Sequence, residues 1–240
     1  MNIKQVIVAL VLLAAGIAVF GFLASRTAPV ATTPQTQMVA ASQSLEEGPY
    51  LRMVVDYPEA TSPERAVIET DMRALAAQFK ANAQIDSLTP EDVAIQGLGG
   101  DRKYTLEAEY KKFEAPAHTS YVYLIYEDTL GAHPNVYFKT FVFDRAGNKV
   151  ALSSLFPNNP NWLEELSLLV STDVSAQYRE RAQVDDLTNL IYPEGVSPNE
   201  ANFSNFVVDG DTLVIFIPPY QVAAYAVGAF EVRIPLASLQ

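Results

Sequence analysis

The chain has 240 residues, 49% of them hydrophobic, so it is long enough and apolar enough to bury a sizeable core. Its 16 Lys and Arg against 28 Asp and Glu leave a formal net charge of −12 at pH 7. This acidity argues against nucleic acid and against a surface held to anionic lipid by basic patches, because both need clustered cations. Cysteine is absent, which excludes disulfides, thiolate metal sites and cysteine nucleophiles, and 2 histidines cannot build a three-histidine zinc site.

The N-terminal part of the chain contains an uncharged apolar segment, residues 6–24, which reads VIVALVLLAAGIAVFGFLA. At about 1.5 Å of rise per residue, a helix of this length nearly crosses the roughly 30 Å hydrocarbon core of a bilayer. Residues 1–24 therefore predict a transmembrane signal-anchor helix, and a cleaved signal peptide is the alternative. Both interpretations place the rest of the chain outside the cytoplasm, as the extracytoplasmic domain of a single-pass cell-membrane protein or, after cleavage, as a secreted protein. Because only five residues precede the segment, we expect no cytoplasmic effector domain.

Residues 25–48 are rich in Ser, Thr, Ala, Pro and Gln and show neither helical nor strand periodicity. Such a composition predicts a flexible stalk that holds the folded part away from the membrane. The folded part then begins at residue 49.

The first half of the folded part predicts a strand, a helix and then further strands. Residues 49–58 alternate apolar and polar side chains, as a half-buried strand does. Residues 61–83 carry apolar side chains at helical spacing, and Thr61 and Glu64 have the spacing of a capping box. After a loop with Pro90 and several glycines, we expect strands at 103–113, 119–126 and 135–144.

The second half predicts a helix over residues 161–181 and then a hairpin. Residues 203–208 and 212–217 flank a turn in which Gly210 is able to adopt a positive φ, and a last strand covers 229–235. Helices placed between hairpins, rather than regular βαβ alternation, predict an α+β fold with antiparallel sheets and helices packed on one face.

The segment LGAHPN, between two predicted strands, suggests a shaped turn because it holds Gly, Pro and Asn together. It supplies His133, Pro134 and Asn135 as candidate ligand-binding residues. His133 is either ligand-facing or an acid/base group; the alternative is that its imidazole fixes the loop through hydrogen bonds to nearby backbone.

An aromatic segment near the C-terminus, FIPPYQVAAYAVG, runs from a predicted strand into an irregular junction, since its two prolines prevent a continuing ladder. Tyr220, Gln221 and Tyr225 are candidate ligand-binding residues here. Together with Trp162, the two tyrosines predict a platform for sugar rings or for a protein partner, and aromatic side chains of the core are the alternative.

No motif in the sequence assigns a catalytic residue. Glu107 and Glu109 lie two apart on a predicted strand and so share a face; paired carboxylates perform acid/base chemistry, but the solvated side of a sheet has the same pattern. The chain has no G-x-S-x-G elbow, no glycine-rich phosphate loop and no loop with calcium-site spacing. We therefore expect no metal and no cofactor.

The segments GAHPN, LSSLF, NFSNFVV, DTLVIFIPPYQVAAYAVG and EVRIPL resemble an extracytoplasmic domain family of bacteria. This family, a domain of unknown function, forms the sensor half of RsiV-type lysozyme-binding anti-sigma factors and the non-catalytic N-terminal part of PdaC-type peptidoglycan deacetylases. VVDYPEA and the helix after it resemble the smaller domain that usually precedes it. The resemblance implies an N-terminal α+β subdomain over residues 49–128 and an RsiV-like α+β domain over 129–240. In this chain Leu130 stands where the family often has a glycine.

We therefore expect a membrane-tethered extracytoplasmic binding or sensor module that is not an enzyme. The implied partner is an envelope ligand, either a lysozyme-like protein or peptidoglycan, without nucleic acid. The alternative is a cell-wall glycan hydrolase or deacetylase that uses His133 and a carboxylate, and a structural role in assembly is a third possibility.

Overall fold

The computed structural model describes residues 42–240, which belong to one compact unit. The predicted signal-anchor and most of the predicted stalk lie outside the described residues. Within residues 42–240, no helix combines the length and hydropathy that a membrane span requires.

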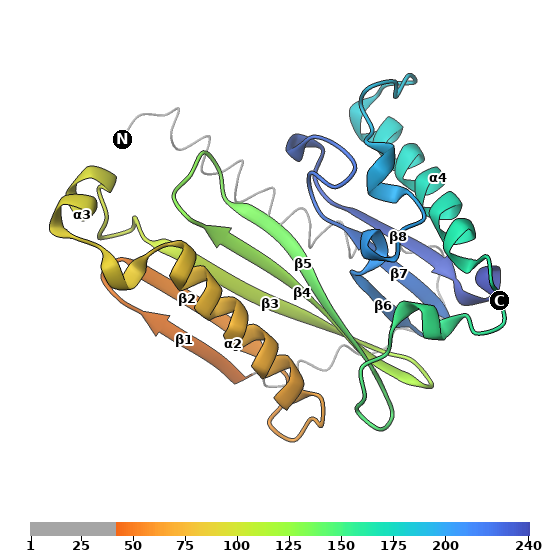
Figure 1. Cartoon of the computed structure of the whole chain (residues 1–240), viewed down its shortest axis with the longest axis horizontal. Coiled ribbons are helices and arrows are strands. Elements are labelled where there is room, and N and C mark those ends of the chain that lie inside the picture. Colours follow the sequence, from red (N-terminus) through yellow and green to blue (C-terminus); the bar gives the residue numbers. More distant parts are fainter. Residues whose placement is uncertain (1–41) are drawn as a thin grey trace. The chain divides into compact units, whose positions relative to one another are not determined.

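Helices and strands alternate irregularly along the described part, and short 3₁₀ turns join several of them (Figure 1). The elements are β1 (Ser42–Glu47), β2 (Leu51–Tyr57), α2 (Arg65–Asn82), α3 (Pro90–Gln96), β3 (Tyr104–Glu114), β4 (His118–Asp128), β5 (Asn135–Asp144), α4 (Trp162–Ala182), β6 (Phe206–Asp209), β7 (Thr212–Ile217) and β8 (Phe230–Pro235). The strand and helix positions expected from periodicity are thereby confirmed within a few residues at most ends. Residues 90–96, expected as part of a loop, instead form the short helix α3.

The first sheet is mixed, with strand order β1-β2-β3-β4-β5. β2 pairs with β3 in parallel, whereas the other neighbouring pairs are antiparallel. The prediction of purely antiparallel sheets is therefore wrong for this sheet. The physical reason is the crossover: α2 and α3 lie between β2 and β3 and return the chain to the end at which β2 began.

Helix α2 covers one face of this sheet, as Figure 1 shows. Ile68, Met72 and Phe79 are fully or almost fully buried at helical spacing against the apolar side chains of the strands. The expected capping box at Thr61 and Glu64 does not form, because the helix begins at Arg65 and Glu64 makes no side-chain cap bond. A capping box is present instead at the start of α3.

Two predicted boundaries need to be moved. β1 pairs along its length with β2, so residues 42–47 of the predicted stalk are an edge strand of the first sheet. The boundary expected between residues 128 and 129 falls inside the β4–β5 hairpin. Its two strands pair continuously, from His118 opposite Asp144 to Glu127 opposite Asn135. The first sheet is therefore complete only after β5.

The second sheet is antiparallel, with order β6-β7-β8, and α4 packs on one of its faces. Leu166, Val170 and Val174 of α4 are fully buried there. Gly210 in the β6–β7 turn has φ +63°, a conformation that glycine adopts without steric cost.

Strand β6 is joined to the first sheet by side-chain hydroxyls. Ser120 on β4 is fully buried, and its Oγ accepts a hydrogen bond from the Val208 amide at 3.1 Å. Thr140 on β5 accepts in the same way from the Phe206 amide at 3.1 Å. These contacts satisfy backbone groups of β6 that have no neighbouring strand on that side.

Candidate functional site

Two segments that are distant in the sequence meet at one surface. The β4–β5 loop, residues 129–134, supplies His133, and the segment after β7 supplies Tyr220 and Tyr225. The His133 and Tyr225 rings stack with centroids 4.3 Å apart and planes 24° apart. The Tyr220 and Tyr225 rings lie 5.3 Å apart, between centroids. We call His133, Tyr220 and Tyr225 the aromatic face.

Hydrogen bonds determine how these rings are held. The Pro134 carbonyl oxygen accepts from the Tyr225 hydroxyl at 3.0 Å and lies 2.9 Å from His133 Nδ1. Since a carbonyl only accepts, Nδ1 carries the proton in this contact. In the neutral imidazole, Nε2 then accepts from the Tyr220 hydroxyl, whose oxygen is 2.9 Å away. Both ring nitrogens of His133 are therefore hydrogen-bonded. The contact of Nδ1 with a backbone carbonyl is of the kind that the alternative interpretation of this residue expected.

The backbone on both sides of the aromatic face is strained. Tyr220 has φ +71° and Leu130, in the opposite loop, has φ +62°. Non-glycine residues avoid this left-handed region, and bulky ones rarely occupy it. Leu130 therefore occupies a position whose backbone suits the glycine that the family often has there. Tyr220 remains 54% exposed in spite of its ring contacts, so its side chain is presented to solvent.

Burial and neighbouring groups raise the pKa of two tyrosines at or near this surface. Burial raises the pKa of the Tyr225 hydroxyl, and Tyr220 adds to the increase. Burial also raises the pKa of Tyr126 on β4, with further contributions from the carboxylates of Asp128 and Glu107. Tyr225 and Tyr126 therefore remain protonated across the physiological range.

The remaining predicted site residues have other surroundings. The Gln221 amide nitrogen donates to the carbonyl oxygens of Gly195 and Asn202, both at 2.8 Å, and so holds loops together. Asn135 is exposed at the start of β5. Trp162 lies at the start of α4 and stacks on Phe156 at 5.5 Å, so its ring is used in core contacts.

The paired carboxylates predicted on β3 do share a face. Glu107 forms an ion pair with Arg52 on β2. Burial raises the pKa of Glu109, and the charges of Asp56 and Glu107 add to this effect. No described contact joins either glutamate to His133. Within residues 42–240, no cluster of His, Asp and Glu has the geometry to hold a metal ion.

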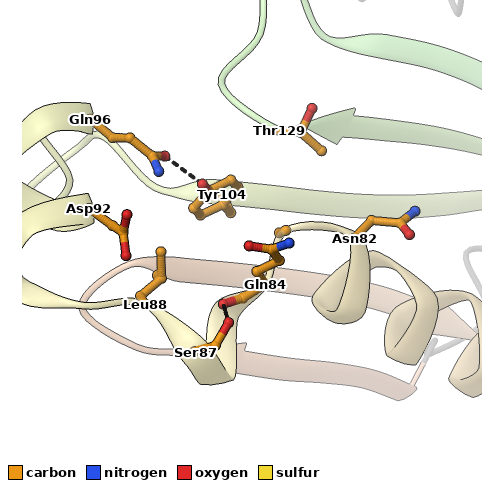
Figure 2. Close-up of a pocket in the computed structure, with 9 residues that line it drawn as sticks. Asn82, Gln84, Ser87, Leu88, Asp92, Gln96, Tyr104 and Thr129 are labelled. Atoms are coloured by element: carbon orange, nitrogen blue, oxygen red, sulfur yellow. Dashed lines mark hydrogen bonds between the residues drawn. The ribbon is translucent and has the colours of Figure 1, made fainter.

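Sequence reasoning missed a polar cavity of about 310 Å³ between α2, α3, β3 and the β4–β5 loop. Figure 2 shows Gln84, Asp92 and Gln96 around the Tyr104 ring, with Thr129 on the opposite side. The capping box spacing of Thr89 and Asp92, next to Pro90, was the signal in the sequence that could have revealed helix α3 and hence this wall.

Comparisons with known proteins find a family model that matches part of the chain. Residues 153–237 match the family described as "Protein of unknown function (DUF3298)". The peptidoglycan-N-acetylmuramic acid deacetylase PdaC of Bacillus subtilis is 23% identical over 209 residues, which cover 85% of this chain and 42% of that protein. This chain thus spans less than half of PdaC. The expected relationship to this family and to PdaC is confirmed, whereas the link to lysozyme binding stays a prediction.

Two further similarities are to a solved structure and to a protein named as an esterase. A crystal structure of a DUF3298 family member from Bacteroides fragilis superposes with a TM-score of 0.54 at 16% identity, covering 82% of this chain and 89% of that one. At this identity the likeness supports the fold alone. The esterase Rv3036c of Mycobacterium tuberculosis is 22% identical over 144 residues, which cover 58% of this chain and 60% of that protein.

Proposed function

We propose that this chain, whose residues 153–237 match the DUF3298 family, is a membrane-tethered extracytoplasmic binding module that recognises peptidoglycan through its aromatic face. The observation that carries the proposal is the convergence of His133, Tyr220 and Tyr225 from two segments on one exposed surface. Two sequence motifs that were separate candidates lie side by side in three dimensions.

The geometry suits recognition of a sugar ring or of another amphipathic surface. Aromatic rings offer large apolar area, while the hydroxyls of Tyr220 and Tyr225 supply polar contacts at the ring edges. The hydrogen bonds through Pro134 restrict two of these rings before any ligand arrives, which lowers the entropy cost of binding.

The name of the relative PdaC supports peptidoglycan as the ligand. A lysozyme-like protein is the other envelope ligand to test, because the net charge of −12 attracts cationic proteins over long range. The uncharged segment 6–24 supports the tether.

A hydrolase or deacetylase is the second candidate, and the similarity to an esterase favours it. Against it stands the position of His133, whose nitrogens are both hydrogen-bonded and neither of them to a carboxylate. To take a proton from a substrate, Nε2 would have to release the Tyr220 hydroxyl, and no carboxylate orients the imidazole through Nδ1. We therefore propose binding without catalysis.

The test uses the full chain in mild detergent, incubated with insoluble peptidoglycan and, separately, with immobilised lysozyme. We expect retention on peptidoglycan, and a loss of affinity of about 10-fold or more in Tyr220→Ala and His133→Ala, as central aromatic contacts typically give. Tyr192→Ala is the matched control, because Tyr192 is 42% exposed and lies outside the aromatic face.

Each other outcome has a definite meaning. No retention of the wild-type chain, or equal retention of Tyr220→Ala, contradicts peptidoglycan binding at the aromatic face. Retention on lysozyme alone replaces the proposed ligand with a protein. Turnover of peptidoglycan or of an ester by the wild type, abolished in His133→Ala, establishes the hydrolase in its place.

A further inference from the structure

The polar cavity between α2 and α3 has the dimensions of a small ligand site. Its volume of about 310 Å³ lies at the lower end of the range of roughly 300–1,000 Å³ typical of ligand pockets. Its walls come from the end of α2, the 3₁₀ turn Ile85–Ser87, α3, the start of β3 and Thr129. A ligand of one ring, or one residue of a longer chain, matches this space.

The polar groups of the cavity are mainly neutral. Asn82, Gln84 and Gln96 contribute side-chain amides, and Ser87 and Thr129 contribute hydroxyls. No lysine, arginine or histidine is among the residues that line it. Such a lining offers many donors and acceptors but no counter-charge for an anion.

The carboxylate in the wall is that of Asp92. Its Oδ2 accepts hydrogen bonds from the Thr89 amide at 2.9 Å and from the Thr89 hydroxyl at 2.6 Å. These two hydrogen bonds hold the pKa of Asp92 below its usual range, and the bond from the Thr89 hydroxyl has the larger effect. The carboxyl group is therefore ionised at neutral pH. A negatively charged ligand is therefore repelled.

Tyr104 and Leu88 supply most of the apolar part of the wall. The Tyr104 ring is buried, and its hydroxyl donates to Gln96 Oε1 at 2.5 Å (Figure 2). This contact fixes the Gln96 amide and leaves its nitrogen as a donor. Leu88 adds an aliphatic side chain beside the ring. The ligand that fits has one apolar face and several neutral polar groups.

We propose that this cavity binds a neutral pyranose sugar. The sugar ring contacts Tyr104 and Leu88, while its hydroxyls pair with the amides and hydroxyls of the wall. The residues that line the cavity do not include those of the aromatic face, although Thr129 and His133 belong to the same loop.

The experiment is a ligand-observed saturation-transfer NMR titration of the full chain in detergent with N-acetylglucosamine, and with glucuronate as the charged comparison. We expect saturable binding of N-acetylglucosamine and at least fivefold weaker binding of glucuronate. Thr129→Trp fills the exposed rim and is expected to abolish the signal; Thr172→Trp, exposed on α4, is its matched control.

A second variant protects the test against misfolding. Gln96→Glu keeps the acceptor for the Tyr104 hydroxyl but removes the amide donor, so we expect about a fivefold weaker affinity with an unchanged melting temperature. Gln183→Glu, at the end of α4, is its control.

The proposal is overturned if the wild type gives no saturable signal, if Thr129→Trp binds as the wild type does, or if glucuronate binds equally well. Tyr220→Ala separates the two sites. It removes retention on peptidoglycan if the aromatic face is the site proposed above, and it leaves the monosaccharide signal unchanged if the cavity is independent.

Discussion

The His133 imidazole stacks on the Tyr225 ring with their centroids 4.3 Å apart, and both groups hydrogen-bond to the same carbonyl, that of Pro134. The contact joins a loop of the first sheet to the segment between β7 and β8 of the second sheet. It therefore depends on how the two sheets lie against each other, and any change in that arrangement alters the aromatic face.

Replacing Tyr220 with glycine tests whether its strained backbone has a stability cost. At φ +71°, a left-handed L-residue costs about 1–2 kcal/mol, whereas glycine costs about 0.5–1 kcal/mol of backbone entropy. Tyr220→Gly and Tyr220→Ala both lose the ring contacts and the hydrogen bond to His133, but only alanine keeps the strain. We therefore expect Tyr220→Gly to be more stable than Tyr220→Ala by about 0.5–1 kcal/mol. Urea denaturation measures both. Equal free energies of unfolding in the two variants would show that Tyr220 is not strained.

Ser120→Ala tests the link between β4 and β6. The substitution leaves the buried Val208 amide without its acceptor, for which a cost of about 1–3 kcal/mol is expected. Ser154→Ala, which removes an exposed hydroxyl that donates to Ala151, should change stability by no more than about 0.5 kcal/mol. Thermal unfolding followed by circular dichroism compares the two. A wild-type melting temperature in Ser120→Ala contradicts a structural role for this hydroxyl.

Asp144 predicts a loss of stability in acid. The side-chain amide of Asn148 and its backbone amide both donate hydrogen bonds to the Asp144 carboxylate. They hold the pKa of Asp144 below the usual value, and the side-chain bond has the larger effect. A depressed folded-state pKa stabilises the fold above the unfolded pKa of about 3.9, and this contribution is lost as pH falls through the folded-state pKa. We therefore expect Asp144→Asn to be less stable than the wild type at pH 7, with a smaller difference at pH 2.5.

The measurement is urea denaturation at both pH values. Asn148→Ala removes the principal partner of the carboxylate, so it should reduce the same pH dependence while keeping Asp144 itself. A gap between wild type and Asp144→Asn that is as large at pH 2.5 as at pH 7 would contradict the assignment.

The sequence alone determined where most elements lie. Residues 135–144 were expected as a strand and are β5, and the helix expected over 161–181 is α4 at Trp162–Ala182. These features depend on side-chain periodicity, which is local: alternation marks a half-buried strand, and apolar positions three and four apart mark a helix face. The same local patterns identified His133, Tyr220 and Tyr225 as members of shaped, aromatic-rich loops.

Only the tertiary structure decided which elements are partners. Alternation does not encode strand direction, so the parallel pairing of β2 with β3 and the edge strand β1, in a segment with polar, exposed side chains, were not predicted. The stacking of His133 on Tyr225 joins distant segments, and the cavity beside Tyr104 brings together residues from Asn82 to Thr129. Such arrangements follow from long-range packing, and no window of neighbouring residues contains that information.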